Sequence, residues 1–170
     1  MLETYRVVDL TDERGNMAAF ILAGLGADVV LVEPPDGSGA RRRGPFAGDV
    51  VDGERSLTFW GWNRGKRSAV LDLAADDGRR ALAALCADAD VVIESGAVDV
   101  DLAALRAANP ALVTVSITAR PGSSSVTTST WLPSADEQMP AAPPGSGIFF
   151  VIRRSTGSNT PTKTSSSFSV

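Results

Sequence analysis

The sequence contains no histidine and a single cysteine, and only 6% of its 170 residues are aromatic. The absence of histidine excludes Ser-His-Asp and Cys-His catalytic pairs, a histidine general base and most zinc sites. One cysteine, Cys86, excludes an internal disulfide and favours a reducing, cytoplasmic location. We therefore expect chemistry based on carboxylates, lysines, hydroxyls or backbone groups, with neither a metal nor a resident cofactor.

Long apolar runs are also missing. The runs present fall far below the roughly 20 residues that cross a bilayer, and the first six residues lack the features of a signal peptide, so we expect no membrane segment. The net charge of −4 argues against a nucleic-acid-binding domain, which would carry a basic surplus. With 44% hydrophobic residues, the chain has enough apolar surface for the core of about one domain.

Between residues 5 and 117, short β-type runs alternate with segments of helical apolar spacing, which is typical of βα units around a parallel sheet. The run Val29-Val30-Leu31-Val32 indicates a strand that is buried on both faces, and the prolines after it end it. The predicted strands span residues 6–10, 28–33, 69–73, 90–94 and 112–117. The expected fold class is α/β, a Rossmann-like parallel sheet with flanking helices, although an incomplete one.

Apolar spacing also predicts the helices. Met17, Phe20, Ile21 and Leu25 recur at i, i+3, i+4 and i+8, one face of an amphipathic helix that Gly26 would end. After the second strand, residues 34–56 form a loop rich in Gly, Arg and Asp. A loop of that length in a compact domain is usually functional or mobile.

In the next helix, Leu82, Leu85 and Cys86 fall on one inward face, and Asp76 is placed to cap it. Cys86 is therefore interpreted as a small buried hydrophobe and not as a nucleophile, because no histidine can activate it. Asp101 is interpreted as a helix N-terminal residue that the helix dipole favours.

Residues 119–170 differ in composition: they contain 19 Ser or Thr, against 10 in residues 1–118. Such a segment buries too little apolar surface to offset its ordering entropy, so we expect a disordered Ser/Thr/Pro-rich tail, apart from the apolar run at 148–152. The predicted division is a Rossmann-like region at residues 1–118 and a low-complexity tail at residues 119–170.

A string of segments carries a family resemblance. In chain order they are Val8-Asp9-Leu10-Thr11, Leu22-Ala23-Gly24-Leu25-Gly26-Ala27-Asp28, Val32-Glu33-Pro34-Pro35, Arg43-Gly44-Pro45-Phe46, Asn63-Arg64-Gly65-Lys66-Arg67-Ser68 and Asn109-Pro110-Ala111-Leu112-Val113. In this order and spacing they resemble the start of the class III CoA-transferases, a family that includes formyl-CoA transferase, carnitine CoA-transferase and α-methylacyl-CoA racemase.

The resemblance implies transfer of CoA from an acyl-CoA to a carboxylic acid. An aspartate carboxylate would attack the thioester and carry the acyl group as a mixed anhydride, which is covalent catalysis by a carboxylate. The resemblance also implies a Rossmann-like domain that holds CoA as a substrate, and subunits that interlock as a homodimer.

The same resemblance places CoA at the ends of the parallel strands, and the loops there carry basic residues. Arginine forks and lysine ammonium groups both suit phosphates. The CoA-binding candidates are Arg41, Asn63, Arg64 and Lys66. Solvated loop charges are the alternative. Phe59, Trp60 and Trp62 are interpreted as a packing cluster in preference to an adenine platform.

The chain also departs from the family pattern. Glu13-Arg14-Gly15-Asn16 replaces a small-residue and Gly-Pro element, and Ser95-Gly96-Ala97-Val98 replaces an Asn-aromatic-Pro-Gly turn. The family's nucleophilic aspartate would follow Thr118 by a few tens of residues, but Asp136 comes too early and no acidic residue follows Glu137. We therefore name no catalytic residue.

Three functions remain open: an acyl-CoA:carboxylate CoA-transferase in a truncated, inactive form, a non-catalytic fragment with a partial CoA site, and a nucleotide-binding dehydrogenase-like domain. The third is disfavoured because residues 11–16, after the first strand, contain only one glycine, Gly15. The composition change suggests a shift of reading frame near Ala119. Without the remaining polypeptide, we expect a monomer or a non-specific aggregate instead of an interlocked dimer.

Overall fold

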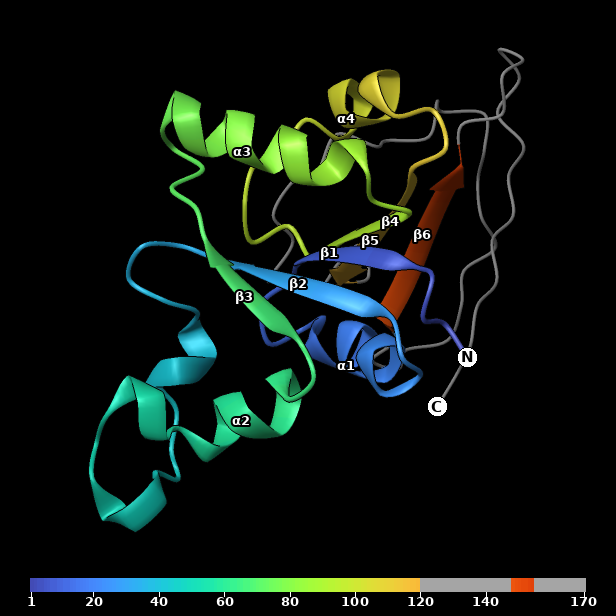
Figure 1. Ribbon diagram of the computed structural model, residues 1–170. Helices are drawn as coiled ribbons and strands as arrows, with labels where there is room; N and C mark the ends of the chain where they lie inside the picture. Colours follow the sequence, from blue (N-terminus) through green and yellow to red (C-terminus); the bar gives the residue numbers. More distant parts are fainter. Residues whose placement is uncertain (120–147, 155–170) are drawn as a thin grey trace.

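One six-stranded sheet organises the computed structural model, which describes residues 1–119 and 148–154 (Figure 1). The strands are β1 (Arg6–Leu10), β2 (Asp28–Glu33), β3 (Arg67–Val70), β4 (Val91–Glu94), β5 (Val113–Ala119) and β6 (Ile148–Arg154). The α-helices are α1 (Asn16–Gly24), α2 (Leu57–Asn63), α3 (Asp76–Ala87) and α4 (Leu102–Ala108). The α/β fold class predicted from the sequence is confirmed, and β1 and β2 have the predicted bounds.

The strand order is β3-β2-β1-β4-β5-β6, and the first five strands are parallel. The chain runs outward from β1 to β3, then returns to the other side of β1 and continues through β4 and β5. Val8 therefore pairs with Val30 on one side and with Val92 on the other. This reversal of direction between β1 and β4 is the topological switch point beside which open α/β sheets bind ligands.

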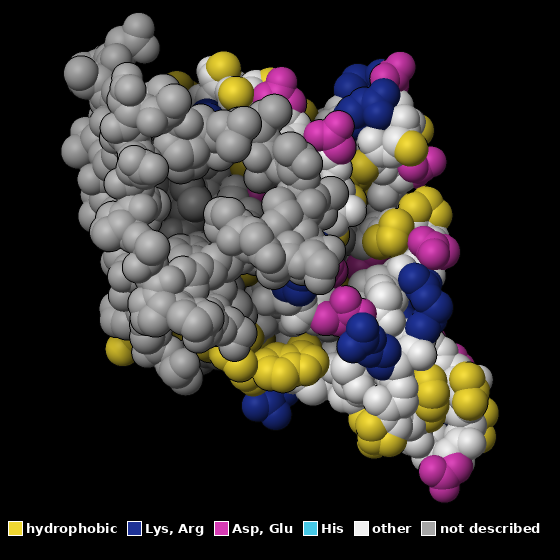
Figure 2. All heavy atoms as spheres, turned by 180° about the vertical axis from the view of Figure 1, so that it is seen from behind, with side chains coloured by type: hydrophobic (Ala, Val, Ile, Leu, Met, Phe, Trp, Pro, Cys, Tyr) yellow, Lys and Arg dark blue, Asp and Glu magenta, His cyan; other side chains and the backbone are white. Residues whose placement is uncertain are grey.

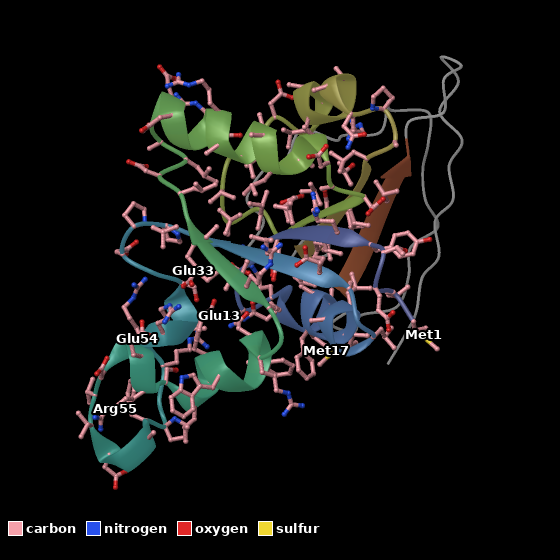
Figure 3. All side chains as sticks on the ribbon, viewed as in Figure 1. Met1, Glu13, Met17, Glu33, Glu54 and Arg55 are labelled. Carbon is pink, nitrogen blue, oxygen red and sulfur yellow. The ribbon has the colours of Figure 1, made fainter. Side chains whose placement is uncertain are left out.

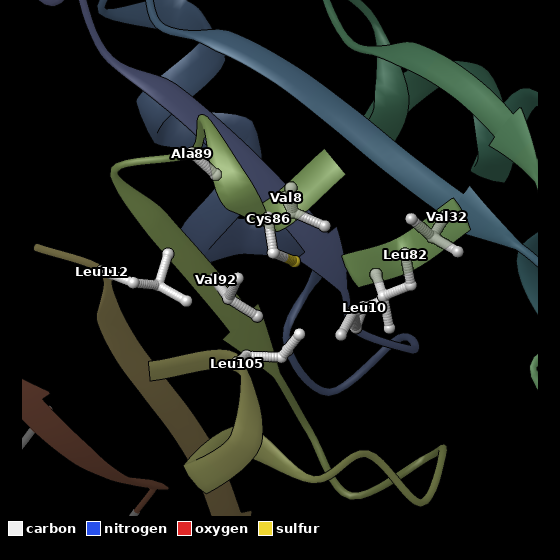
Figure 4. Packing of buried hydrophobic residues seen from close by; sticks show 9 residues of the cluster. All are labelled: Val8, Leu10, Val32, Leu82, Cys86, Ala89, Val92, Leu105 and Leu112. Atoms are coloured by element: carbon white, nitrogen blue, oxygen red, sulfur yellow. The ribbon is translucent and has the colours of Figure 1, made fainter. Parts of the chain in front are cut away.

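Two apolar layers cover the sheet, with α3 and α4 on one face and α1 on the other (Figure 1). Successive β1 residues alternate between them: Val8 packs toward α3, and Val7 packs toward α1. Leu82 and Cys86 of α3 point inward as predicted (Figure 4). Burial raises the pKa of the Cys86 thiol to about 11, which makes it a poor nucleophile at neutral pH.

The apolar face predicted for α1 is wrong. Met17 and Ile21 are 57% and 51% exposed, whereas Ala19 is fully buried against the sheet. Helix α1 is apolar on several sides, so spacing alone did not distinguish the two faces, and the small side chain of Ala19 allows the closer approach to the strands. Figure 2 shows that hydrophobic side chains are exposed at several places on this face of the molecule, its lower part included.

Residues 34–63 form an arm that extends away from the sheet beyond β2 (Figure 1). It contains three short 3₁₀ turns, Gly39–Arg42, Ala47–Asp49 and Gly53–Arg55, followed by α2, which the sequence analysis did not predict. The buried Ser56 hydroxyl joins these parts, because it donates to the carbonyl of Ala40 at 2.8 Å and accepts from the N–H of Phe59 at 3.1 Å. Ser56 thus caps α2.

Other boundaries also differ from the predictions, those of β4 and β5 by one or two residues at an end. Strand β3 lies earlier than residues 69–73, because the carbonyl and carboxylate of Asp72 accept from Ala75 and Ala74 and turn the chain. The N-cap of α3 is Ala75 without a side-chain bond, so Asp76 is its first helical residue and not its cap. Asp101, by contrast, caps α4 through two backbone N–H groups.

The apolar run noted near the C-terminus lies in β6, which pairs antiparallel with β5 in the register Val115↔Ile152. The rest of the predicted disordered tail, residues 120–147 and 155–170, lies outside the described residues. Among the helices of the described part, none is long and apolar enough to span a membrane.

Candidate functional site

An apolar slot of about 240 Å³ opens where β1, β2 and β3 end. Its lining residues are Leu10, Val32, Pro34, Pro35, Leu71, Asp72, Leu73, Ala74 and Val98. Ligands of open α/β sheets bind outside the carboxyl ends of the strands, which is where this slot lies. The slot is smaller than the roughly 300 Å³ at which drug-sized pockets begin, so its size suits one part of a larger ligand.

At the switch point, the carboxylate of Asp12, just after β1, connects to Ser95, just after β4. It accepts from the Ser95 hydroxyl at 2.9 Å and forms an ion pair with Arg14 at 2.7 Å. Burial alone would raise the pKa of Asp12, but hydrogen bonds from Arg14 and Ser95 outweigh it and lower that pKa. Asp12 is thus held ionised as a structural acceptor beside the crevice.

Arg41, a predicted CoA contact, is already occupied. Its Nε and one terminal nitrogen donate to the two carboxylate oxygens of Glu33 at 2.6 and 2.8 Å, and its other terminal nitrogen donates to Glu54 at 2.7 Å. The guanidinium also stacks 3.7 Å from the Phe59 ring centroid. Figure 3 shows Glu33 at the end of β2 and Glu54 on the arm, so Arg41 ties the arm to the sheet.

Glu33 is saturated by these contacts, because it also accepts from the Ser68 hydroxyl and the backbone N–H of Ser38. Its side chain is 1% exposed. Burial would raise the pKa of Glu33, but the bonds from Arg41, Ser68 and Ser38 lower it to about 2. In nucleotide-binding sheets a carboxylate near this position binds ribose, and here its oxygens are engaged within the chain.

Lys66, another predicted contact, lies inside the fold. Its ammonium donates to Asp9 and to the side-chain oxygen of Asn63, each at 2.9 Å. The Lys66 side chain is 1% exposed and that of Asp9 is fully buried. The carboxylate of Asp9 also accepts hydrogen bonds from the backbone N–H and the hydroxyl of Thr11. The contacts of Asp9 and Lys66 therefore connect β1, the turn after it and the end of α2.

Arg64 lies on the α1 face of the sheet, opposite the slot. Its guanidinium is 5.0 Å from the Phe20 ring centroid, and Phe20 meets Trp62 edge to face. Trp60 and Trp62 are 48% and 37% exposed, so the prediction that this aromatic cluster is packed in a core is wrong for the two tryptophans.

The structure therefore brings two of the four predicted site residues together, Asn63 and Lys66, and places Arg41 and Arg64 elsewhere. Whether any of the four contacts CoA stays a prediction. The slot residues were not predicted as a site. Position gave a signal for Pro34, which directly follows a strand of the expected sheet. It gave none for Leu71, which lies inside the predicted third strand and follows β3 only in the structure.

Comparison with known proteins agrees with this architecture. The sequence profile described as CoA-transferase family III matches residues 2–164. The chain is 43% identical over 91 residues to succinyl-CoA:(R)-benzylsuccinate CoA-transferase subunit BbsE of Thauera aromatica, which covers 54% of this chain and 22% of that protein. It is 39% identical over 127 residues to the succinate–glutarate CoA-transferase of Agrobacterium fabrum, covering 69% and 32%.

Among solved structures, a CAIB/BAIF family protein from Brucella suis superposes with a TM-score of 0.57 at 34% identity, over 66% of this chain and 32% of that one. The chain thus spans about a third or less of the length of these relatives. The family profile covers nearly the whole length of the chain, the described fold matches about a third of the solved Brucella suis structure, and the chain belongs to CoA-transferase family III.

Proposed function

We propose that this chain binds the CoA part of an acyl-CoA at the carboxyl edge of its sheet. The observation that carries the proposal is the apolar slot beside the ends of β1, β2 and β3, in a chain of a CoA-transferase family. Its apolar walls suit the base of CoA, and the arginines of the arm, Arg41 to Arg43, are of a residue type that suits its phosphates. The slot takes only one end of so long a ligand.

The reaction class that we propose for the whole protein is transfer of CoA from an acyl-CoA to a carboxylic acid. The two relatives above are named for the CoA thioesters and carboxylates on which they act, among them succinate, benzylsuccinate and glutarate. For this chain, the partners proposed are therefore an acyl-CoA and a carboxylic acid.

We propose further that the described residues bind CoA without catalysing the exchange. Among these residues, the most buried carboxylates at the sheet are held by cations: Asp9 by Lys66, and Glu33 by Arg41. A carboxylate that is hydrogen-bonded and ion-paired is a weak nucleophile, because attack requires those bonds to break. Covalent catalysis would need a carboxylate that approaches the thioester freely.

Calorimetric titration with CoA, followed by an exchange assay with an acyl-CoA and a second carboxylic acid, tests both statements. Binding without exchange is the expected result. Exchange by the purified chain would overturn the proposal that it is inactive, and absence of CoA binding would overturn the proposed site.

The reading-frame proposal has its own test. Translation of the other two frames of the gene beyond codon 118 should yield a glycine-rich continuation that contains an aspartate. If neither frame yields such a continuation, the proposed shift of reading frame is wrong. Sedimentation equilibrium tests the accompanying proposal that the chain does not form the family's interlocked dimer.

A further inference from the structure

Two arginines beside the slot, Arg42 and Arg79, are anchored on backbone carbonyls. A terminal nitrogen of Arg42 donates to the carbonyl of Asp36 at 3.0 Å, in the turn that directly follows the slot residue Pro35. A terminal nitrogen of Arg79 donates to the carbonyls of Leu73 and Ala74 at 2.9 and 2.7 Å. Leu73 and Ala74 both line the slot.

Both guanidiniums remain accessible. The side chains of Arg42 and Arg79 are 60% and 52% exposed, and their carboxylate partners, Asp36 and Asp76, are 73% and 79% exposed. Such surface ion pairs contribute roughly 0–1 kcal/mol or less, so a stronger anion displaces them readily. Arg41 contrasts with these two, because it is 18% exposed and its donors are engaged by Glu33 and Glu54.

We infer that Arg42 and Arg79 hold phosphate groups of the ligand whose adenosine end occupies the slot. The inference rests on the proposed function, because it assigns the charged part of the same ligand. CoA carries a phosphate on its ribose and a diphosphate on the adjoining chain, so anionic groups leave the adenosine in two directions. Guanidinium forks bind phosphate oxygens bidentately, and anchoring on carbonyls orients both forks before the ligand arrives.

The chain supplies matched controls for both arginines. Arg43 and Arg80 are the exposed sequence neighbours of Arg42 and Arg79, and Arg43 pairs with Glu13 at 3.1 Å. Within the described residues, neither has a hydrogen bond to the walls of the slot. Replacing any one of the four arginines with glutamine removes the same charge, so only the place of that charge differs.

The test is calorimetric measurement of the dissociation constant for CoA with the wild-type chain and the variants R42Q, R79Q, R43Q and R80Q. Loss of a charged hydrogen bond predicts about tenfold or greater weakening for R42Q and for R79Q. The two controls should change the constant by less than about twofold at the same ionic strength. If R42Q and R79Q bind CoA no more weakly than their neighbours' variants, the inference is overturned.

Adenosine, which lacks phosphate, is the second probe, and its binding is also measured by calorimetry. All four variants should bind adenosine as the wild type does. Weaker adenosine binding by R42Q or R79Q would mean that the substitution deforms the slot, and this would overturn a direct phosphate role. If the wild-type chain binds no CoA, the proposed function and this inference are both overturned. If the wild type binds CoA and neither R42Q nor R79Q weakens that binding, the inference alone is overturned.

Discussion

The ammonium of Lys66 lies 2.9 Å from the carboxylate of Asp9, and both side chains are at most 1% exposed. These residues stand 57 positions apart in the chain. The pair joins β1 to the end of α2, and the carbonyl of Asn16 at the start of α1 lies 3.5 Å from the same ammonium. In this arrangement the donors of Lys66 are engaged within the fold by Asp9, Asn63 and Asn16.

Lys66→Ala should therefore lower stability strongly. Removing one partner of a buried pair leaves an uncompensated charge and costs about 3–5 kcal/mol, measurable by urea unfolding. Arg67→Ala is the control, because the Arg67–Asp28 pair is 64% and 39% exposed and contributes about 0–1 kcal/mol. Equal losses for the two variants would contradict the burial of Lys66.

Glu33 should make the fold sensitive to acid. Its folded pKa of about 2 lies below the ordinary value of 4.5, so its ionised form stabilises the fold fully above about pH 4.5. That contribution, roughly 3 kcal/mol, is lost as the pH falls from about 4.5 to about 2. The unfolding free energy measured across this window should fall less steeply in Glu33→Gln. Glu54→Gln, at an 81% exposed position, should leave the slope nearly unchanged.

Gly78 in α3 should not tolerate a side chain. A Cβ at this position would lie 1.9 Å from the carbonyl oxygen of Asp72, so Gly78→Ala should destabilise the fold despite the higher helix propensity of alanine. Gly61 in α2 has open space around the same atom, and Gly61→Ala should stabilise by about 0.5–1 kcal/mol. Thermal unfolding of the two variants checks the opposite signs. If both substitutions stabilised the protein, the close approach of Gly78 to the carbonyl of Asp72 would be contradicted.

The exposed face of α1 makes a further prediction. Ile21→Lys should change the unfolding free energy by less than about 0.5 kcal/mol, because Ile21 is 51% exposed. Ala19→Leu should cost about 1–3 kcal/mol, because Ala19 is fully buried against the sheet. Urea unfolding distinguishes the two. A large loss for Ile21→Lys would restore the face predicted from apolar spacing.

The sequence predicted β1 and β2 well because short valine-rich segments bounded by prolines or polar turns leave few alternatives. It failed on the face of α1, where apolar residues occur around the helix and the decisive factor is how closely Ala19 approaches the strands. It also missed α2, a short helix whose cap, Ser56, is held by a carbonyl of the arm.

The candidate site was harder to predict because the role of a cation depends on partners that sequence position does not reveal. Arg41 and Arg42 are neighbours in a run of three arginines, yet one is held by Glu33 and the other stays 60% exposed. Lys66 lies in a segment typical of the family, but its partner is a carboxylate of the first strand. The ends of β1 and β2, by contrast, were predicted correctly, and the slot lies at both of them and at the end of β3, which was not.

The most direct test of the central claim is the perturbation of backbone amide resonances when CoA is added to the ¹⁵N-labelled chain. Binding at the slot predicts the largest shifts in residues 36–37 and 71–75 and at Leu10, which surround or line it. Shifts confined to the opposite face, around Phe20 and Arg64, or no shifts at saturating CoA, would contradict the claim.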